Sequence, residues 1–325
     1  MLNTITDVPG IKVGHYTDTK AITGCTVILC PSGAVAGVDV RGSAPGTRET
    51  ALLDPICRSQ QVHAIVLSGG SAFGLETAGG VMRYLEEHGH GLDVGVAKIP
   101  IVPAAILFDL FTGDPKVRPG VEEGYKACLA ATDTGVAEGS VGAGTGAAVG
   151  KAFGREQAIK SGVGTASHRC VDGTTVGAIV AVNAFGDVVD PSTGKIMTGP
   201  RDPNGKGIFS TTEILAGCSQ FTHPFFSNTT IGVIATDAPL TKVEANKLAQ
   251  IGHDGIAIAI RPCHTVVDGD VLFALSTSDD KNKAGQANML QLGVIATQVI
   301  SEAIVRAVTQ ANSLGNLPAL KDIRG

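Results

Sequence analysis

The stretch Ser227-Asn228-Thr229-Thr230-Ile231-Gly232-Val233-Ile234-Ala235-Thr236-Asp237 decides the fold, because it places hydroxyl residues directly before a strand-like apolar run. A chain cut before Thr229 would give that residue a free α-amine, of ordinary pKa about 7.7–8.0, beside its own hydroxyl. Such an amine accepts the hydroxyl proton near neutral pH. The stretch therefore predicts a strand that begins with a nucleophile and its base, although an ordinary Asn-Thr-Thr turn also fits these residues.

Six further blocks carry a resemblance to a known family. They are residues 6–15, 39–50, 67–75, 141–146, 182–186 and 264–274. Together with the stretch around Thr229, and in the same order, they resemble the DmpA-type aminopeptidases, which are self-processing amidases with an N-terminal nucleophile. The chain is most similar to their nylon-oligomer hydrolase branch. The resemblance implies an αββα sandwich and one domain, residues 1–325, that is cut between Asn228 and Thr229 into fragments 1–228 and 229–325.

Composition and charge describe a compact protein that acts on small molecules. The 325 residues include 43 glycines and no tryptophan, and 17% of them are charged. The net charge is −5, and no stripe of lysine and arginine interleaved with aromatic residues offsets it, which excludes a nucleic-acid binder. We therefore expect a small peptide or amide as the partner.

The cysteines and the N-terminus indicate a cytoplasmic protein. Seven cysteines, an odd number with no Cys-x-x-Cys pair, favour reduced thiols over a disulfide framework or a zinc ribbon. The first residues have neither a basic region nor an apolar region of a signal peptide, and no run of about 18 apolar residues occurs. Secretion and membrane insertion are not expected.

Short apolar runs bounded by glycine or polar turns alternate with helical patterns. The expected strands are residues 26–29, 64–67, 176–182, 231–235, 256–260 and 271–275. Helices are expected over 73–87, over 284–314 with a break near Gly293, and from Thr241, where Glu244 completes a capping box. This mixture predicts an α/β or α+β protein, and spacing alone leaves the order of the layers open.

Four more residues complete the amidase that the resemblance implies. Read alone, Lys151 is a solvated lysine, Asn183 is a hairpin asparagine, and Asp268-Gly269-Asp270 is a turn before a strand. The resemblance makes Lys151 a catalytic cation and Asn183 an oxyanion donor. It also implies that both aspartates orient the threonine hydroxyl and the new amine, whose pKa the lysine and the aspartates shift in opposite directions.

The implied mechanism needs neither a metal nor an organic cofactor. Thr229 Oγ attacks a substrate amide while its α-amine takes the proton, Asn183 stabilises the oxyanion, and water hydrolyses the acyl-enzyme. The resemblance further implies a homo-oligomer, a tetramer. An acyltransferase with the same nucleophile, or a ligand-binding member that has lost catalysis, stays open as an alternative.

Three residues are expected near the substrate pocket. Ser71 opens a helix beside the cleft, His264 lies beside the aspartate loop, and Phe108 stands where several relatives carry a tyrosine hydroxyl. Phe108 therefore predicts a preference for less polar acyl groups.

Other motifs fit less well. Residues 142–147 match the dinucleotide pattern G-x-G-x-x-A without a launching strand, residues 145–152 fail as a phosphate loop, and Phe73 breaks the nucleophile elbow that Ser71 would need.

Overall fold

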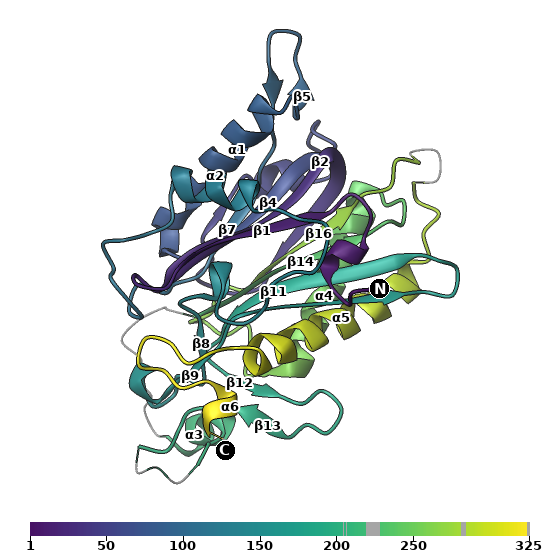
Figure 1. Ribbon diagram of the computed structural model, residues 1–325. Helices are drawn as coiled ribbons and strands as arrows, with labels where there is room; N and C mark the ends of the chain where they lie inside the picture. The colour runs from purple at the N-terminus through teal and green to yellow at the C-terminus, as the bar shows by residue number, and fades with distance from the viewer. Residues whose placement is uncertain (204, 206, 219–227, 281–283, 324–325) are drawn as a thin grey trace.

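A nine-stranded sheet runs through the centre of the protein (Figure 1). The computed structural model describes residues 1–203, 205, 207–218, 228–280 and 284–323, so Ser227 of the decisive stretch lies outside it. The strand order is β10-β11-β14-β16-β2-β4-β7-β3, with β1 also paired to β2. These strands are β1 (Lys12–Asp18), β2 (Thr23–Val40), β3 (Thr47–Arg48), β4 (Val62–Ser68), β7 (Ala104–Ile106), β10 (Val163–Arg169), β11 (Thr175–Asn183), β14 (Thr229–Thr236) and β16 (Val271–Ser276).

The long strand β2 belongs to both halves of this sheet. Its first part pairs with β1 and β4, and its last part, from Val35 to Val40, pairs with β16. The register shifts between Leu29 and Ala34, where Gly33 has a φ of +92°. Side chains other than glycine rarely adopt that conformation, so the glycine permits the irregularity at which β2 passes from one half to the other.

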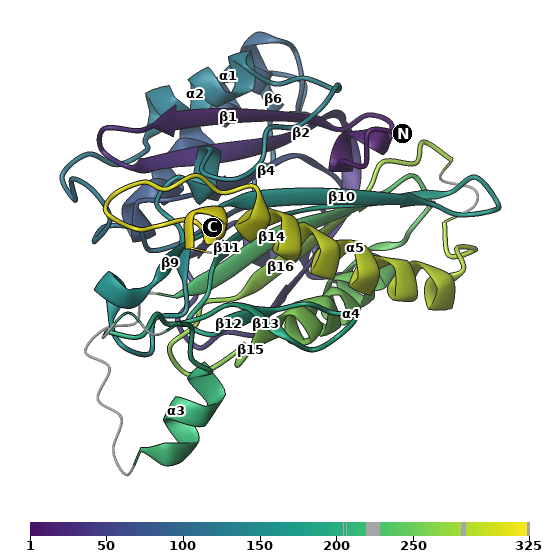
Figure 2. The same ribbon diagram turned by 60° about the horizontal axis from the view of Figure 1, so that its bottom comes forward.

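Two pairs of helices cover the outer faces (Figures 1 and 2). Helices α4 (Lys242–Ala259) and α5 (Met289–Thr309) pack on the half that contains β10, β11, β14 and β16, whereas α1 (Thr77–Glu87) and α2 (Val121–Leu129) pack on the half with β1 and β4. An inner core joins the two halves. Ile231 and Val233 of β14 face this inner core, and the next residue, Ile234, points to the opposite side of the strand and faces α4 and α5. The four layers confirm the expected αββα sandwich.

Helix α4 begins as the sequence predicts. The Thr241 hydroxyl accepts a hydrogen bond from Glu244 N at 3.2 Å, and Glu244 Oε2 accepts one from Thr241 N at 2.8 Å. The helix continues to Ala259, so the strand expected over 256–260 is wrong, and only Ile260 begins the short strand β15 (Ile260–Arg261). The apolar run belongs to the buried face of α4, and this packing outweighs its β-branched composition.

The other expected elements are confirmed with changed limits. The runs 26–29, 64–67, 176–182, 231–235 and 271–275 lie within β2, β4, β11, β14 and β16. The helix expected over 73–87 is divided into the 3₁₀ helix η3 (Ser71–Glu76) and α1. Helix α5 continues through Gly293 without a break. The glycine serves the packing of the two helices, since a Cβ there would lie 3.0 Å from the Ile251 side chain of α4.

Short elements complete the chain. They are η1 (Ile5–Asp7), η2 (Thr50–Leu53), β5 (Leu92–Asp93), β6 (Lys98–Ile99), η4 (Gly142–Gly144), β8 (Ala148–Val149), η5 (Arg155–Gln157), β9 (Ile159–Lys160), β12 (Asp187–Val189), β13 (Ile196–Thr198), α3 (Thr211–Gly217) and α6 (Leu320–Ile323). Among the described residues, only α5 is long and apolar enough to cross a membrane, and 56% of its most apolar window is buried. Its packing on β10, β11 and α4 explains that composition as a core helix.

Candidate active site

The expected nucleophile is the first residue of a central strand. Thr229 begins β14 and is 4% exposed. Its hydroxyl donates to the carbonyl oxygen of Asn228 at 2.5 Å, within the peptide bond that is expected to be cut. Strand β14 pairs with β11 on one side and with β16 on the other. The sheet therefore holds this hydroxyl rigidly beside the Asn228 carbonyl group.

Asn183 and Lys151 meet next to this position. Asn183 is the last residue of β11, directly opposite Thr229 in the antiparallel register, and it is buried. Lys151 Nζ donates to both Asn183 O and Asn183 Oδ1, each at 2.8 Å. The Asn183 Oδ1 also accepts from Ala148 N at 3.1 Å, and its Nδ2 donates to Phe108 O at 3.0 Å. These contacts fix the orientation of the Asn183 amide and bring two of the expected site residues, Lys151 and Asn183, together.

A glycine turn brings Lys151 to this place. Gly150 has a φ of +71°, and a Cβ on it would lie 2.3 Å from the backbone of Gly199. Only glycine fits this turn, after which Lys151 N donates to Phe185 O at 3.1 Å. Burial lowers the pKa of Lys151 well below its usual value, Arg155 adds to this effect, and Asp268 opposes it. A buried lysine of lowered pKa gives up its proton more readily than a solvated lysine does.

The two aspartates lie on the other side of Thr229. Asn228 forms a parallel bridge with Asp268, just before β16. The Asp268 carboxylate accepts from Thr265 N at 3.0 Å and from the Thr265 hydroxyl at 2.5 Å. Burial raises the pKa of Asp268 to about 6, and the charge of Asp270 adds to the rise. The Asp270 Oδ1 accepts from Thr230 N at 2.6 Å, which ties the aspartate to the start of β14.

In the described contacts, His264 forms hydrogen bonds with Asp270 and not with Thr229. Both its backbone N and its Nδ1 donate to Asp270 Oδ2, at 3.0 and 2.7 Å. Burial lowers the pKa of His264, but the hydrogen bond with Asp270 and the neighbouring Cys263 outweigh it and raise the pKa to about 10. The imidazolium therefore forms a charge-assisted hydrogen bond with Asp270.

Ser71 and Phe108 lie on neighbouring segments. Ser71 begins η3, as expected for a helix start, and its backbone N donates to Leu107 O at 3.0 Å. Within the described residues, no hydrogen bond joins Ser71 to Thr229, Lys151 or Asn183. The Phe108 carbonyl holds the Asn183 amide, and its ring lies 5.1 Å from the ring of Phe111. Phe108 thus borders the site through its backbone.

The sequence did not single out the backbone N–H of Gly269. It donates to Asn228 O at 2.9 Å, from the middle of the Asp-Gly-Asp turn. The glycine between the two aspartates was the available signal, because a glycine beside expected catalytic residues often marks a close approach of backbones. Thr265, which holds Asp268, was also missed.

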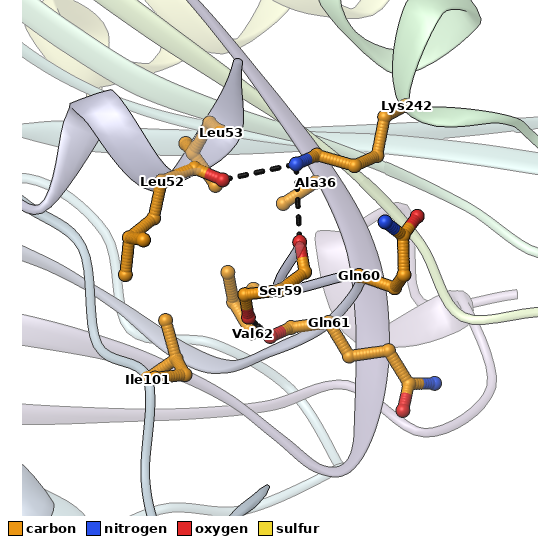
Figure 3. Close-up of a pocket in the computed structure, with 9 residues that line it drawn as sticks. All are labelled: Ala36, Leu52, Leu53, Ser59, Gln60, Gln61, Val62, Ile101 and Lys242. Atoms are coloured by element: carbon orange, nitrogen blue, oxygen red, sulfur yellow. Dashed lines mark hydrogen bonds between the residues drawn. The ribbon is translucent and has the colours of Figure 1, made fainter. Parts of the chain in front are cut away.

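Lys242 fills a cavity that is separate from this site (Figure 3). The cavity is lined by Ala36, Leu52, Leu53, Ser59, Gln60, Gln61, Val62, Ile101 and Lys242. The ammonium group donates to four backbone carbonyls, those of Leu52, Asp54, Cys57 and Ser59, at 2.6–3.2 Å. The lysine therefore ties α4 to the segment between η2 and β4. Among the described residues, no group of three or more His, Cys, Asp or Glu side chains is placed to hold a metal ion.

Over most of its length the chain is similar to a peptidase family and to proteins named as aminopeptidases and hydrolases. The model of Peptidase family S58 matches residues 3–318. An uncharacterized aminopeptidase of Mycobacterium leprae is 43% identical, over 98% of this chain and 93% of its own length. A 6-aminohexanoate-oligomer endohydrolase of Paenarthrobacter ureafaciens is 32% identical, over 93% of this chain and 84% of its own. The solved L-aminopeptidase D-Ala-esterase/amidase of Ochrobactrum anthropi, described as a variant of the Ntn hydrolase fold, superposes with a TM-score of 0.70. It is 20% identical, over 95% of this chain and 86% of that chain.

Proposed function

The chain belongs to peptidase family S58, and on this premise we propose that it cuts its own Asn228–Thr229 bond and then hydrolyses amide bonds of small substrates through an acyl-Thr229 intermediate. The expected membership and the expected enzyme class, a peptidase or amidase, are confirmed. The observation that supports the site most directly is the position of the Thr229 hydroxyl, buried and 2.5 Å from Asn228 O, between Asn183 and the aspartate turn.

The contacts support a role for each residue in turnover. After cleavage, the Thr229 amine takes the proton of its own hydroxyl as Oγ attacks the substrate carbonyl. The Asn183 amide, held by Lys151, stabilises the negative charge that develops on the carbonyl oxygen. Asp268, with a pKa of about 6, is ionised at pH 7–8 and balances the charge of the new ammonium.

Proton transfer in this site depends on groups with opposite effects. A cation at Lys151 lowers the pKa of the Thr229 amine, and the carboxylates of Asp268 and Asp270 raise it. Because the pKa of Lys151 is well below its usual value, its effect weakens as the lysine loses its proton. Loss of the lysine proton therefore favours a more basic amine, which accepts the hydroxyl proton.

Intact-mass measurement and N-terminal sequencing of the smaller fragment test the proposal. We expect two fragments, 1–228 and 229–325, from the wild-type chain, and one full-length chain from Thr229→Ala. The matched control is Thr230→Ala, because the Thr230 hydroxyl has no hydrogen-bond partner in the described structure, and this variant should still be cut. A wild-type chain that hydrolyses amides while its 228–229 bond stays intact contradicts the proposal.

The substrate class follows from the relatives. One is named an aminopeptidase and another an oligoamide endohydrolase, so we propose small peptides or amides as substrates. Turnover with an added amine separates hydrolysis from acyl transfer, since a transferase would form the new amide in place of the free acid. The proposal includes a cytoplasmic location and a homo-oligomer, a tetramer by resemblance, which light scattering on the processed protein tests.

A further inference from the structure

The carbonyl oxygen of Asn228 receives two hydrogen bonds in the described structure. One comes from the Thr229 hydroxyl at 2.5 Å and the other from Gly269 N at 2.9 Å. The hydroxyl must leave the oxygen when it turns to attack the carbonyl carbon. Among the described donors, the Gly269 N–H is therefore the one that stays on the oxygen while negative charge develops there.

We propose that the backbone N–H of Gly269 is the oxyanion donor for self-cleavage of the Asn228–Thr229 bond. This inference rests on the proposed function. In the cleavage step the bond from Thr229 Oγ to the Asn228 carbonyl carbon forms, and the bond from that carbon to Thr229 N breaks. The hydroxyl proton passes to the departing nitrogen. Water then hydrolyses the ester, which leaves a carboxylate on Asn228 and restores the Thr229 hydroxyl.

Space, and not backbone conformation, explains the glycine at this position. Gly269 is not among the residues with positive φ, so another residue could adopt its backbone angles. A Cβ there would lie 2.4 Å from Ala44 O and 3.0 Å from the Thr229 hydroxyl oxygen. Any side chain would therefore push the turn away from the bond to be cut and lengthen the hydrogen bond to Asn228 O.

A neighbouring segment holds the turn against the bond. Ala44 N donates to Asp268 O at 2.9 Å, and Arg41 N donates to Asp270 O at 3.0 Å. Gly42 lies between them, and a Cβ on it would lie 2.3 Å from Asp270 N and 2.4 Å from Asp268 O. The backbone of residues 41–44 thus fixes both ends of the turn, and Gly42 is a positioning residue for the Gly269 N–H.

Cleavage has to be followed from the moment of synthesis, so the full chain is made by cell-free translation and its intact fraction is measured by mass against time. Gly269→Ala should slow cleavage by about 10²–10³-fold, the usual effect of losing one oxyanion donor. Gly42→Ala should slow it in the same direction. Gly135→Ala is the matched control, because a Cβ on this exposed glycine meets no atom within 4 Å, and it should cleave at the wild-type rate.

Replacement of Gly269 by glycolate turns its backbone amide into an ester, which removes the N–H and adds no side chain. This substitution tests the proposal if Gly269→Ala fails to fold. This ester should show the same loss of rate, with circular dichroism and gel-filtration elution equal to those of the wild type. Cleavage of the ester chain within threefold of the wild-type rate overturns the inference. If the wild-type chain itself is not cut at Asn228, the proposed function fails instead, so the two failures are distinguishable.

Discussion

Replacement of Asn183 by aspartate isolates the oxyanion donor of the proposed mechanism. Aspartate keeps the shape of the side chain and keeps Oδ1, which accepts from Lys151 Nζ at 2.8 Å and from Ala148 N at 3.1 Å. It replaces the Nδ2 group, which donates to Phe108 O at 3.0 Å, by an oxygen with no proton. The variant thus loses the proposed oxyanion donor and the hydrogen bond to Phe108 O, while the two contacts of Oδ1 are retained.

The expected loss is large. Removal of one oxyanion donor costs about 3–4 kcal/mol in the transition state, which lowers kcat by about 10²–10³-fold. The Phe108 carbonyl also loses its buried partner, and this costs about 1–3 kcal/mol of folding stability. The assay is hydrolysis of an amino-acid p-nitroanilide at saturating concentration, with kcat normalised to the processed fraction counted by N-terminal sequencing.

Asn246→Asp provides the matched control. Its Oδ1 accepts from Val38 N at 3.1 Å and its Nδ2 donates to Leu53 O at 3.0 Å, so this amide is also held by backbone groups, but on helix α4. The control should lose stability and keep kcat. A processed Asn183→Asp enzyme with kcat within threefold of wild type would refute the oxyanion role of Asn183.

Three further expectations concern stability and specificity, each measured on a single variant. Lys242→Met removes four hydrogen bonds to backbone carbonyls and should lower the free energy of unfolding by about 3 kcal/mol in urea titrations of the uncleaved Thr229→Ala chain. Burial raises the pKa of Asp187 from 3.8 to about 6, so this group's contribution to stability is full below pH 3.8 and is lost as the pH rises through 6. At 1.36 kcal/mol per pH unit this loss is about 3 kcal/mol. Between pH 4 and 7 the free energy of unfolding of the Asp187→Asn variant should therefore fall less than that of the chain with Asp187. An equal fall in both chains would contradict the raised pKa of Asp187. Phe108→Tyr should raise kcat/KM for substrates with a polar acyl group relative to apolar ones, and an unchanged ratio would show that the ring does not reach the substrate.

The sequence predicts the existence of most strands and helices better than their limits, and the order of the layers followed only from the family resemblance. Strands such as β11 and β14 are recognisable because they are short, β-branched and bounded by turns. The run 256–260 has the same local composition, yet it belongs to α4, because its long-range packing on the sheet decides its conformation. Local composition carries no record of that packing, so the last turn of α4 could not be predicted.

The candidate site was likewise predictable only in part. Thr229, Lys151, Asn183, Asp268 and Asp270 are recognisable from motifs, and the structure brings these distant segments together. The hydrogen bonds from Lys151 to Asn183 and the position of Gly269 N depend on how the turn at Gly150 and the Asp-Gly-Asp turn are placed beside the central strands. No residue type specifies that placement, so only the fold reveals which backbone group faces the Asn228–Thr229 bond.

The strand order also sets how the two proposed fragments are held after cleavage. β14 and β16, from residues 229–325, lie between β11 and β2, from residues 1–228, and Lys242 binds carbonyls of the first fragment. Separation of the fragments would therefore require opening the sheet along both edges of this strand pair, at the same cost as unfolding. The nicked protein should withstand extreme dilution as a stable pair, and neither fragment should be recoverable alone in a folded form.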